Sequence, residues 1–326
     1  ADDQLTMGPK VKLGVLLPTR GLLLAEPNPG NAARVLDMAE IVEQAGLDSV
    51  WVGDSLTAKP RLEPLSTLAA VAARTWRVRL GTAVLLAALR HPVLMAQTCA
   101  TVDVISQGRL VIAAGVGGAF NEAQRQEWQA AGVDPKDRAA RLEELVEIVK
   151  GLGSGQTMDY SGKHFDLDGV KMQPQPVQKR GIPILLACHW RSGRQAQFLR
   201  AARLADGLIS ISDTPVEYGQ LVRHVRTLAA ELGRDPEAFE ATMYLTVNLD
   251  SNSAKAEADA TEFLTSYYGA NIWGDRWGPF GGPEQVNQKI GEYVEAGAQT
   301  IIVRFASFEP QRQLDIFLNH VAPAWL

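Results

Sequence analysis

The chain has 326 residues, of which 46% are hydrophobic and 21% are charged, and both values are typical of a globular protein. Its formal charge of −5 is dispersed along the chain, so no basic patch predicts binding to nucleic acid or to a membrane surface. No stretch approaches the roughly 20 apolar residues of a membrane span. The two cysteines form no CxxC pair, which argues against a disulfide scaffold and a structural zinc site. We therefore expect a cytoplasmic protein.

Residues 1–10 contain no apolar core behind a basic start, so we predict a short loose tail and no signal peptide. Residues 11–326 are predicted to form one domain, because α/β barrels longer than 250 residues are commonly a single domain.

Short β-branched runs alternate with longer helical stretches, which is typical of βαβ units and a parallel sheet. The predicted strands are Val11–Leu17, Ser49–Val52, Val78–Leu86, Leu110–Ala114, Ile182–Ala187, Gly207–Ile211, Thr242–Leu249 and Thr300–Arg304. Eight is the number of strands that closes a (β/α)8 TIM barrel. The competing doubly wound fold has a glycine-rich first turn, whereas Pro18-Thr19-Arg20-Gly21 follows the first strand here.

Helical periodicity fills the gaps between these strands. The predicted helices are Asn31–Gln44, Pro64–Ala73, Val93–Ile105, Arg138–Lys150, Arg194–Ala205, Val216–Leu232, Ser253–Tyr267, Pro283–Ala296 and Pro310–Val321. Two intervals break the rhythm and predict insertions after strand four and after strand seven. The first, residues 151–178, predicts a small hairpin with a Pro-rich connector. The second, residues 269–282, carries Trp273, Trp277 and Phe280, and this aromatic density favours a packed lid.

Active sites of barrels lie at the carboxyl ends of the strands, and here these ends are poor in catalytic pairs. A glycosidase needs two carboxylates there, and only Asp54 and Glu122 come near. The five histidines are scattered, so no metal site is predicted, and a GxSxG nucleophile turn is absent. The remaining apolar residues, glycines and Arg/Ser-rich turns suit a large flat ligand with an anionic tail, which would itself supply the chemistry.

Two of these strand ends are candidate ligand contacts. Ser192-Gly193-Arg194 opens the predicted fifth helix, where free backbone N–H groups and the helix dipole favour a phosphate. From spacing alone, an ordinary helix start with surface arginines is the slightly stronger interpretation. Gly115 and Gly117 follow strand four and permit a ligand to approach the backbone closely.

A distinctive series of residues runs from the third predicted strand to the end of the fourth. It comprises Leu80-Gly81-Thr82-Ala83-Val84, Arg90-His91-Pro92, Ala96, Thr101-Val102-Asp103, Ser106, Gly108-Arg109 and Gly115-Val116-Gly117. This series resembles the luciferase-like monooxygenase superfamily, which includes bacterial luciferase, alkanesulfonate monooxygenases and deazaflavin-dependent dehydrogenases. Shorter matches near residues 45–51, 205–207, 282–284 and 296–298 extend the resemblance over nearly the whole chain.

The resemblance implies a (β/α)8 barrel that holds an isoalloxazine-type ring across its mouth. It implies that a bulge at the end of strand three, often with a cis peptide bond, backs this ring, and the bulge falls at Ala83, Val84 and Leu85. It also assigns the cofactor phosphate to the turn after strand five, which strengthens the interpretation of Ser192, Gly193 and Arg194. The implied cofactor is FMN, with coenzyme F420 as the alternative.

The chain departs from the superfamily pattern at two strand ends. After strand two, where many relatives have a histidine near the ring, this chain has Asp54 and Ser55. Asp54 is therefore a candidate catalytic residue and Ser55 a candidate pocket residue. Strand five ends in Cys188-His189-Trp190 in place of a glycine pair. We predict that His189 donates a proton or a hydrogen bond and that Trp190 walls the pocket, with plain packing an equal alternative.

Three functions are compatible with these observations. The leading hypothesis is a monooxygenase that uses reduced FMN, supplied by a separate flavin reductase, and oxygen to attack a small organic substrate under the lid. The second is hydride transfer by coenzyme F420, which does not activate oxygen. The third is a barrel that binds small molecules without chemistry. The resemblance also implies a homodimer.

Overall fold

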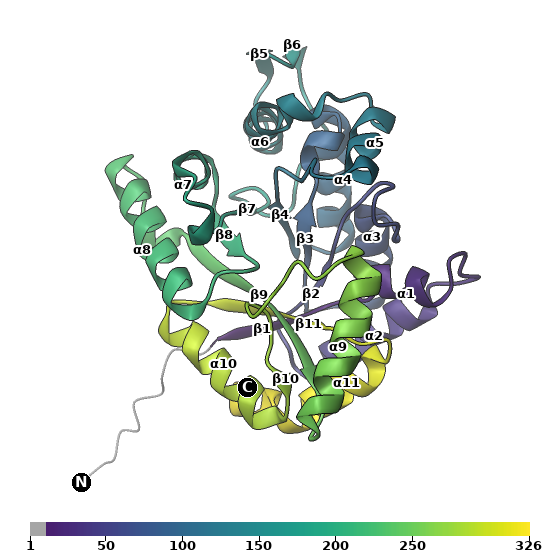
Figure 1. Cartoon of the computed structure of the whole chain (residues 1–326). Coiled ribbons are helices and arrows are strands. Elements are labelled where there is room, and N and C mark those ends of the chain that lie inside the picture. Colours follow the sequence, from purple (N-terminus) through teal and green to yellow (C-terminus); the bar gives the residue numbers. More distant parts are fainter. Residues whose placement is uncertain (1–10) are drawn as a thin grey trace.

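The computed structural model describes residues 11–326, and the predicted tail, residues 1–10, lies outside the described residues. Within the described part, eight parallel strands form a closed barrel surrounded by helices (Figure 1). The barrel strands are β1 (Lys12–Leu16), β2 (Ser49–Val52), β3 (Arg79–Leu85), β4 (Leu110–Ala114), β7 (Ile184–Ala187), β8 (Gly207–Ser210), β9 (Glu240–Leu249) and β11 (Thr300–Phe305). The predicted (β/α)8 fold is confirmed, and each predicted strand agrees with the structure within two residues at either end.

The barrel closes because each terminal strand finds a parallel partner. Strand β1 pairs with both β2 and β11, while β9 pairs with both β11 and β8. Closure leaves the barrel without an unpaired edge, so every strand is covered by hydrogen bonds on both sides. The carboxyl ends of all eight strands therefore meet at one rim.

A tryptophan fills the centre of the barrel. Trp51 on β2 is fully buried in a cluster with Ala83, Val111, Leu185 and other inward-facing residues. The neighbouring strands carry glycines at the contact, because a Cβ on Gly14 would lie 2.6 Å from the Trp51 indole nitrogen and one on Gly81 would overlap the ring. The large residue and the small ones complement each other in volume, as close packing requires.

Eleven helices are described, and most of them form the outer layer (Figure 1). They are α1 (Thr19–Ala25), α2 (Ala33–Gln44), α3 (Pro64–Arg74), α4 (Pro92–Ile105), α5 (Glu122–Ala130), α6 (Arg138–Gly153), α7 (Gln195–Leu204), α8 (Pro215–Glu231), α9 (Ser253–Tyr268), α10 (Pro283–Glu295) and α11 (Pro310–His320). None of them is long and apolar enough to cross a membrane. The sequence did not predict α1 and α5, which lie in the loops after the first and fourth barrel strands. Helix α5 buries only Glu127 and Trp128, so it lacks the apolar stripe by which helices are found.

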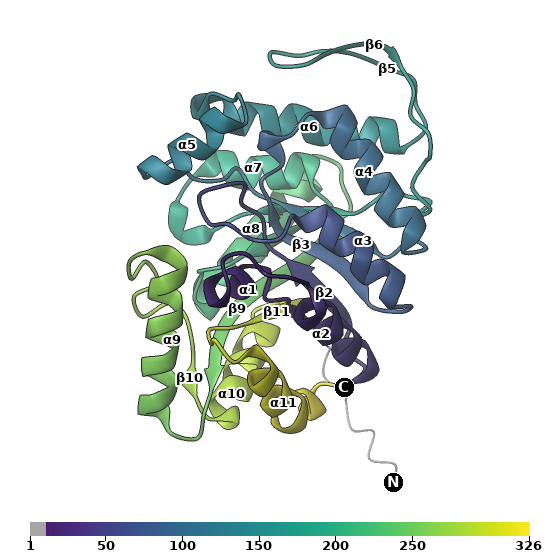
Figure 2. The same ribbon diagram turned by 90° about the vertical axis from the view of Figure 1, so that its right-hand side faces the viewer.

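The two predicted insertions are present. The first, residues 151–178, contains the predicted hairpin, formed by β5 (Met158–Ser161) and β6 (Asp166–Val170), which projects away from the barrel (Figures 1 and 2). The second lies between α9 and α10 and ends in β10 (Phe280–Gly281), a two-residue strand beside β9. We call residues 269–282 the lid.

Candidate functional site at the barrel mouth

Two adjoining cavities open among the loops at the carboxyl ends of the strands. The first, of about 240 Å³, is called the bulge chamber, and it is lined by Asp54, Ser55, Lys59, Arg61, Ala83, Val84, Leu86, Gly118, Gln124, Glu127, Ile211, Tyr244, Tyr267 and Tyr268. The second, of about 580 Å³, is called the lid chamber, and it is lined by Phe120, His189, Arg191, Ser192, Ile211, Ser212, Tyr268, Ile272, Trp273, Arg276 and Trp277. Ile211 and Tyr268 belong to both chambers, so together they form one continuous mouth.

The end of β3 forms the wall of the bulge chamber. The register of β3 against β4 shifts between Thr82 and Leu85, and the Ala83–Val84 peptide bond is cis, as the resemblance implies. Ala83 and Val84 line the chamber, whereas Leu85 is fully buried in the core between barrel and helices. A Cβ on Gly115 would lie 2.9 Å from the Val84 side chain. Glycine at this position therefore leaves room for the bulge itself.

Asp54 ties the loop after β2 to the end of β3. Its Oδ2 accepts hydrogen bonds from the Leu86 backbone N–H at 2.9 Å and from Arg90 Nη1 at 2.6 Å, and Oδ1 accepts one from Arg90 Nη2 at 3.2 Å. The Asp54 side chain is 3% exposed. Both of its oxygens are thus occupied by a bidentate arginine, and the carboxylate orients the loop while lining the chamber.

Glu127 organises the rest of this loop and was not predicted from the sequence. Its Oε1 accepts hydrogen bonds from the Ser55 hydroxyl at 2.6 Å, from the Thr57 N–H at 2.9 Å and from the Ala58 N–H at 3.2 Å. Burial raises the pKa of this carboxyl, but the Ser55 hydroxyl and the two amides outweigh burial and hold it below its ordinary value. Glu127 therefore acts as a fixed anionic anchor for Ser55 and the segment that leads to Lys59.

His189 stands at the end of β7 and faces the lid chamber. Burial, followed by the nearby charge of Arg191, lowers the pKa of its imidazole from 6.5 to about 4. The ring is therefore neutral at pH 7, and it can donate one hydrogen bond and accept another. Asp213 fixes the following turn because its carboxylate accepts the Trp190 N–H at 2.7 Å and the Arg191 N–H at 3.0 Å.

The predicted phosphate-binding residues, Ser192, Gly193 and Arg194, lie at the rim of the lid chamber; we call them the phosphate seat. Ser192 lines this chamber, and its hydroxyl donates to the His189 carbonyl oxygen at 2.7 Å. Gly193 has a φ of +62°, the left-handed conformation that glycine adopts freely. Arg194 is the N-cap residue of α7, forms no side-chain cap and is exposed. The start of α7 thus presents free N–H groups beside exposed Arg191 and Arg194.

Two other residues of this turn point away from the cavity. Trp190 stacks on Phe198 with ring centroids 5.5 Å apart and meets His224 edge-on at 5.6 Å, so it packs between the turn and helices α7 and α8. Cys188 is fully buried, and burial raises the pKa of its thiol to about 12. A thiol with that pKa is inert at neutral pH.

The lid packs over the mouth through its tryptophans. Trp273 and Trp277 line the lid chamber and stack with centroids 6.1 Å apart. Phe280 begins β10 and packs behind them. Arg276 donates to both Glu217 carboxylate oxygens, at 2.8 and 2.9 Å, and to the Ser212 carbonyl oxygen at 3.0 Å. This contact holds the lid to the loop after β8.

Four cations surround the floor of the bulge chamber; the sequence placed Arg20 and Arg304 at strand ends without assigning them a role, and it did not indicate Lys59 or Arg61. Arg61 Nη1 donates to the Tyr267 hydroxyl at 2.9 Å, and Arg304 Nη1 donates to the Tyr268 hydroxyl. Arg20 and Lys59 lie over the rings of Tyr267 and Tyr268, respectively. The usable signal in the sequence is position, since Arg20, Lys59, Arg61 and Arg304 all follow or end barrel strands.

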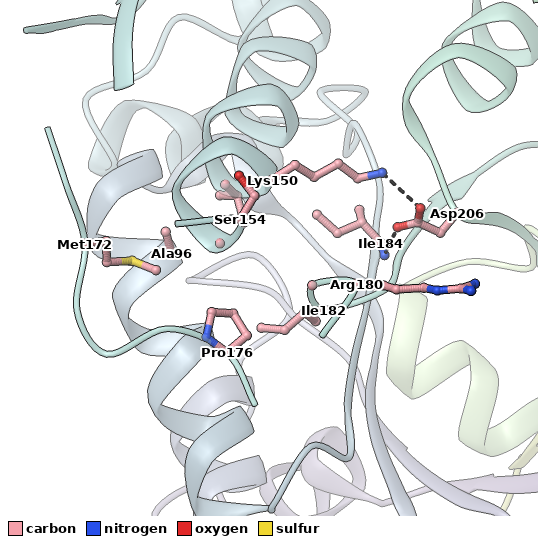
Figure 3. Close-up of a pocket in the computed structure, with 12 residues that line it drawn as sticks. Ala96, Lys150, Ser154, Met172, Pro176, Arg180, Ile182, Ile184 and Asp206 are labelled. Carbon is pink, nitrogen blue, oxygen red and sulfur yellow. Dashed lines mark hydrogen bonds and ion pairs between the residues drawn. The ribbon is translucent and has the colours of Figure 1, made fainter. Parts of the chain in front are cut away.

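A separate cavity of about 100 Å³ lies outside the barrel, between α4, α6 and the connector to β7 (Figure 3). It contains the Lys150–Asp206 ion pair, with nitrogen and oxygen 3.1 Å apart. Ile184 and Asp206 mark the amino ends of β7 and β8, the face opposite the mouth, so this cavity is not part of the site. In the described chain, no group of three or more His, Cys, Asp or Glu residues is arranged to hold a metal ion.

Comparison with known proteins identifies the family. The model of the family described as luciferase-like monooxygenase matches residues 11–277. The chain belongs to this family. The resemblance inferred from strands three and four is thereby confirmed, and the chain is a member of a family of oxidoreductases built on the barrel described above.

Individual proteins similar to this chain include dehydrogenases and a monooxygenase. An F420-dependent glucose-6-phosphate dehydrogenase of Nocardia farcinica is 28% identical over 318 residues, which cover 89% of this chain and 93% of the relative. One of Mycolicibacterium smegmatis is 27% identical over 324 residues, with the same coverage of both chains. Among solved structures, the monooxygenase RslO1 from Streptomyces bottropensis superposes with a TM-score of 0.81 at 24% identity and covers 97% of this chain and 100% of its own. This last likeness concerns the fold.

Proposed function

We propose that the protein is a coenzyme F420-dependent oxidoreductase that transfers a hydride between the deazaflavin and a small organic substrate at the barrel mouth. The observation that carries this proposal is the match, over 89% of the chain, to dehydrogenases named for that coenzyme. The proposal reverses the order of the two cofactors expected from the sequence, where FMN came first.

The mouth fits a long flat cofactor with an anionic tail. The continuous chambers extend from the bulge at Ala83 and Val84 to the turn after β7. The bulge would back the ring, while Arg191, Ser192 and the free N–H groups at the start of α7 would hold the tail. When bound, coenzyme F420 supplies a carbon that accepts or gives the hydride.

The residues of the chain orient the reactants and exclude water. Trp273 and Trp277 cover the lid chamber, and a dry chamber strengthens each polar contact inside it. We assign to neutral His189 a hydrogen bond to the substrate oxygen that gains or loses its proton. Asp54 and Glu127 are positioning residues in this proposal, because each is engaged by groups of its own chain.

The family description, luciferase-like monooxygenase, favours a second candidate, the monooxygenase for which reduced FMN is expected from the sequence. One titration distinguishes the two candidates. Purified protein is titrated with coenzyme F420 and, separately, with oxidised and reduced FMN, and tryptophan fluorescence is followed. We expect coenzyme F420 to bind at least tenfold more tightly than either form of FMN. Equal or tighter binding of FMN would favour the monooxygenase, and binding of neither would refute both.

The phosphate seat can be tested in the same titration. Arg194→Ala removes a cation at the start of α7, so we expect binding of coenzyme F420 to weaken about fivefold, which corresponds to roughly 1 kcal/mol. Arg180→Ala, an exposed arginine at the outer cavity of Figure 3, is the matched control and should leave the affinity unchanged. An unaltered affinity in Arg194→Ala would show that Arg194 does not contribute to binding of the cofactor.

A further inference from the structure

The bulge chamber has a concentration of positive charge that the hydride transfer does not require. Arg20 follows β1, Lys59 and Arg61 follow β2, and Arg304 lies at the end of β11, three strands that are neighbours in the barrel. Among the described residues, no carboxylate lies within 4.0 Å of any of these four cations. Natural proteins seldom bury cations without pairing them, so the cluster calls for an anionic ligand.

Arg304 is the most deeply placed of the four. It is 3% exposed, and its guanidinium carbon lies 4.7 Å from the ring centroid of Trp277 and 5.2 Å from that of Tyr244. Its Nε donates to the Thr246 hydroxyl at 3.0 Å, but its Nη2 is buried without a hydrogen-bond partner. A buried donor without an acceptor is costly, and from behind the tyrosines that line the chamber Arg304 adds an unpaired positive charge to its floor.

The other cations are also incompletely satisfied. Arg20 donates to the carbonyl oxygens of Pro60 and Tyr267 at 3.1 and 3.4 Å, while its Nε is buried without a partner. Burial lowers the pKa of Lys59, and the charge of Arg61 lowers it further. The pKa of Arg20 is lowered by the same two causes. These cations thus repel one another, and an anion between them would relieve the repulsion.

The carboxylates that face the chamber do not neutralise this charge. Asp54 is engaged by Arg90, with Oδ2 2.6 Å from Nη1. Glu127 is engaged by Ser55 and two backbone amides and reaches Lys59 only through its electric field. With Arg90 and its second partner Glu63 counted, five cations face three carboxylates, which still leaves an excess of positive charge at the floor.

The cluster lies across the barrel from the cofactor tail. The cyclic order of the barrel strands is β1, β2, β3, β4, β7, β8, β9 and β11, so β1 stands opposite β7. Arg20, Lys59, Arg61 and Arg304 are centred on β1, whereas Ser192 and Arg194 follow β7. A ligand bound at the β1 side is therefore distinct from the tail of the cofactor.

We propose that Lys59, Arg61 and Arg304 form a subsite for an oxyanion of the substrate, namely a phosphate ester, a sulfonate or a carboxylate. The assignment to the substrate rests on the proposed function, since a cofactor across the mouth leaves this side for the second reactant. Lys59 and Arg61 line the chamber and would contact the oxyanion directly, with Arg304 and the tyrosines behind them. The neutral part of the substrate would then extend toward the bulge.

Anion binding is measured by isothermal titration calorimetry on the full chain saturated with coenzyme F420, so that the β7 side is filled. The probes are inorganic phosphate, inorganic sulfate and acetate, each at constant ionic strength maintained with sodium chloride. The protein variants are Lys59→Met/Arg61→Met and, separately, Arg304→Met. Lys179→Met, which replaces an exposed lysine outside the mouth, is the matched control.

We expect at least one probe to bind the wild-type protein and the Lys179→Met control equally, and to bind Lys59→Met/Arg61→Met at least tenfold more weakly. The probe that binds best identifies the oxyanion, and Arg304→Met should weaken it as well if that variant folds. The double variant should still bind coenzyme F420 with unchanged affinity. Absence of binding by all three probes, or equal affinity for wild type and double variant, would overturn the proposal.

The same measurements separate this proposal from the proposed function. If coenzyme F420 does not bind, the titrations are repeated on the protein without it. Anion binding that depends on Lys59 and Arg61 would then support the subsite while the choice of cofactor fails. If coenzyme F420 binds and no anion does, the proposed function stands and the oxyanion subsite is wrong.

Discussion

At the scale of single residues, the properties of the site depend on neighbours that are distant in the sequence. His189 is neutral because the mouth buries it beside Arg191. Asp54 is anchored by Arg90, 36 residues away, and Ser55 by Glu127, 72 residues away. The sequence identified Asp54, Ser55 and His189 from their positions at strand ends, but it could not give their charge state or their partners.

The pH dependence of folding tests the environment of His189. The unfolded chain binds a proton there near pH 6.5, whereas the folded chain binds one only near pH 4. Between these values the unfolded state binds more protons, so the free energy of unfolding falls as the pH is lowered. In wild type, His189 should account for a decrease of about 1–2 kcal/mol in the free energy of unfolding between pH 7 and pH 5. We expect His189→Gln to lack this part of the decrease.

Urea unfolding at the two pH values provides the measurement. His320→Gln, a substitution of an exposed histidine, is the control and should keep the wild-type pH dependence. If His189→Gln and wild type lose the same free energy, the imidazole is not held neutral by its surroundings.

At the scale of elements, the lid is a covering segment that pairs with β9 through β10 and forms one side-chain ion pair with α8. Its tryptophans pack against Tyr268 at the end of α9, while Arg276 joins it to Glu217 on α8. The aromatic residues predicted the lid from the sequence. The contact between Arg276 and Glu217 joins residues 59 positions apart and is visible only in the folded chain.

Removing this contact should loosen the lid without unfolding the barrel. The Arg276 and Glu217 side chains are 30% and 23% exposed, so Arg276→Met should change the global free energy of unfolding by about 1 kcal/mol or less. Hydrogen exchange within residues 269–282 should become faster, because local opening then breaks fewer contacts. Arg125→Met breaks the exposed pair with Glu122 on α5 and should leave exchange in the lid unchanged. Wild-type protection of the lid in Arg276→Met would show that the tryptophans and the pairing of β10 with β9 hold it without the ion pair.

At the scale of the whole molecule, the barrel closes around Trp51. The residue lies on β2, and glycines at Gly14 and Gly81 on the strands to either side leave space for its ring. All eight barrel strands contribute to one closed set of hydrogen bonds, so a change at this centre affects the stability of the entire fold.

Gly81→Ala places a methyl group where the Trp51 ring lies, and overpacking of this kind costs about 1–3 kcal/mol. We expect a lower midpoint of urea unfolding with an unchanged slope. Gly30→Ala is the control, because its added methyl group meets nothing within 4 Å. Equal stability of wild type and Gly81→Ala would mean that the barrel interior can rearrange around Trp51.

The sequence by itself determined the order and length of the barrel strands, because alternation of apolar runs and helical periodicity is a local property. It also located the bulge, through the resemblance carried by residues near Ala83. Only the tertiary structure decided which side chains face the mouth. Leu85 at the end of β3 and Trp190 after β7 stand beside residues that line the mouth, yet Leu85 lies in the core and Trp190 packs against it. The tertiary structure alone brought Arg20, Lys59, Arg61 and Arg304 together, because closing a barrel joins its first and last strands, and no local pattern records that contact.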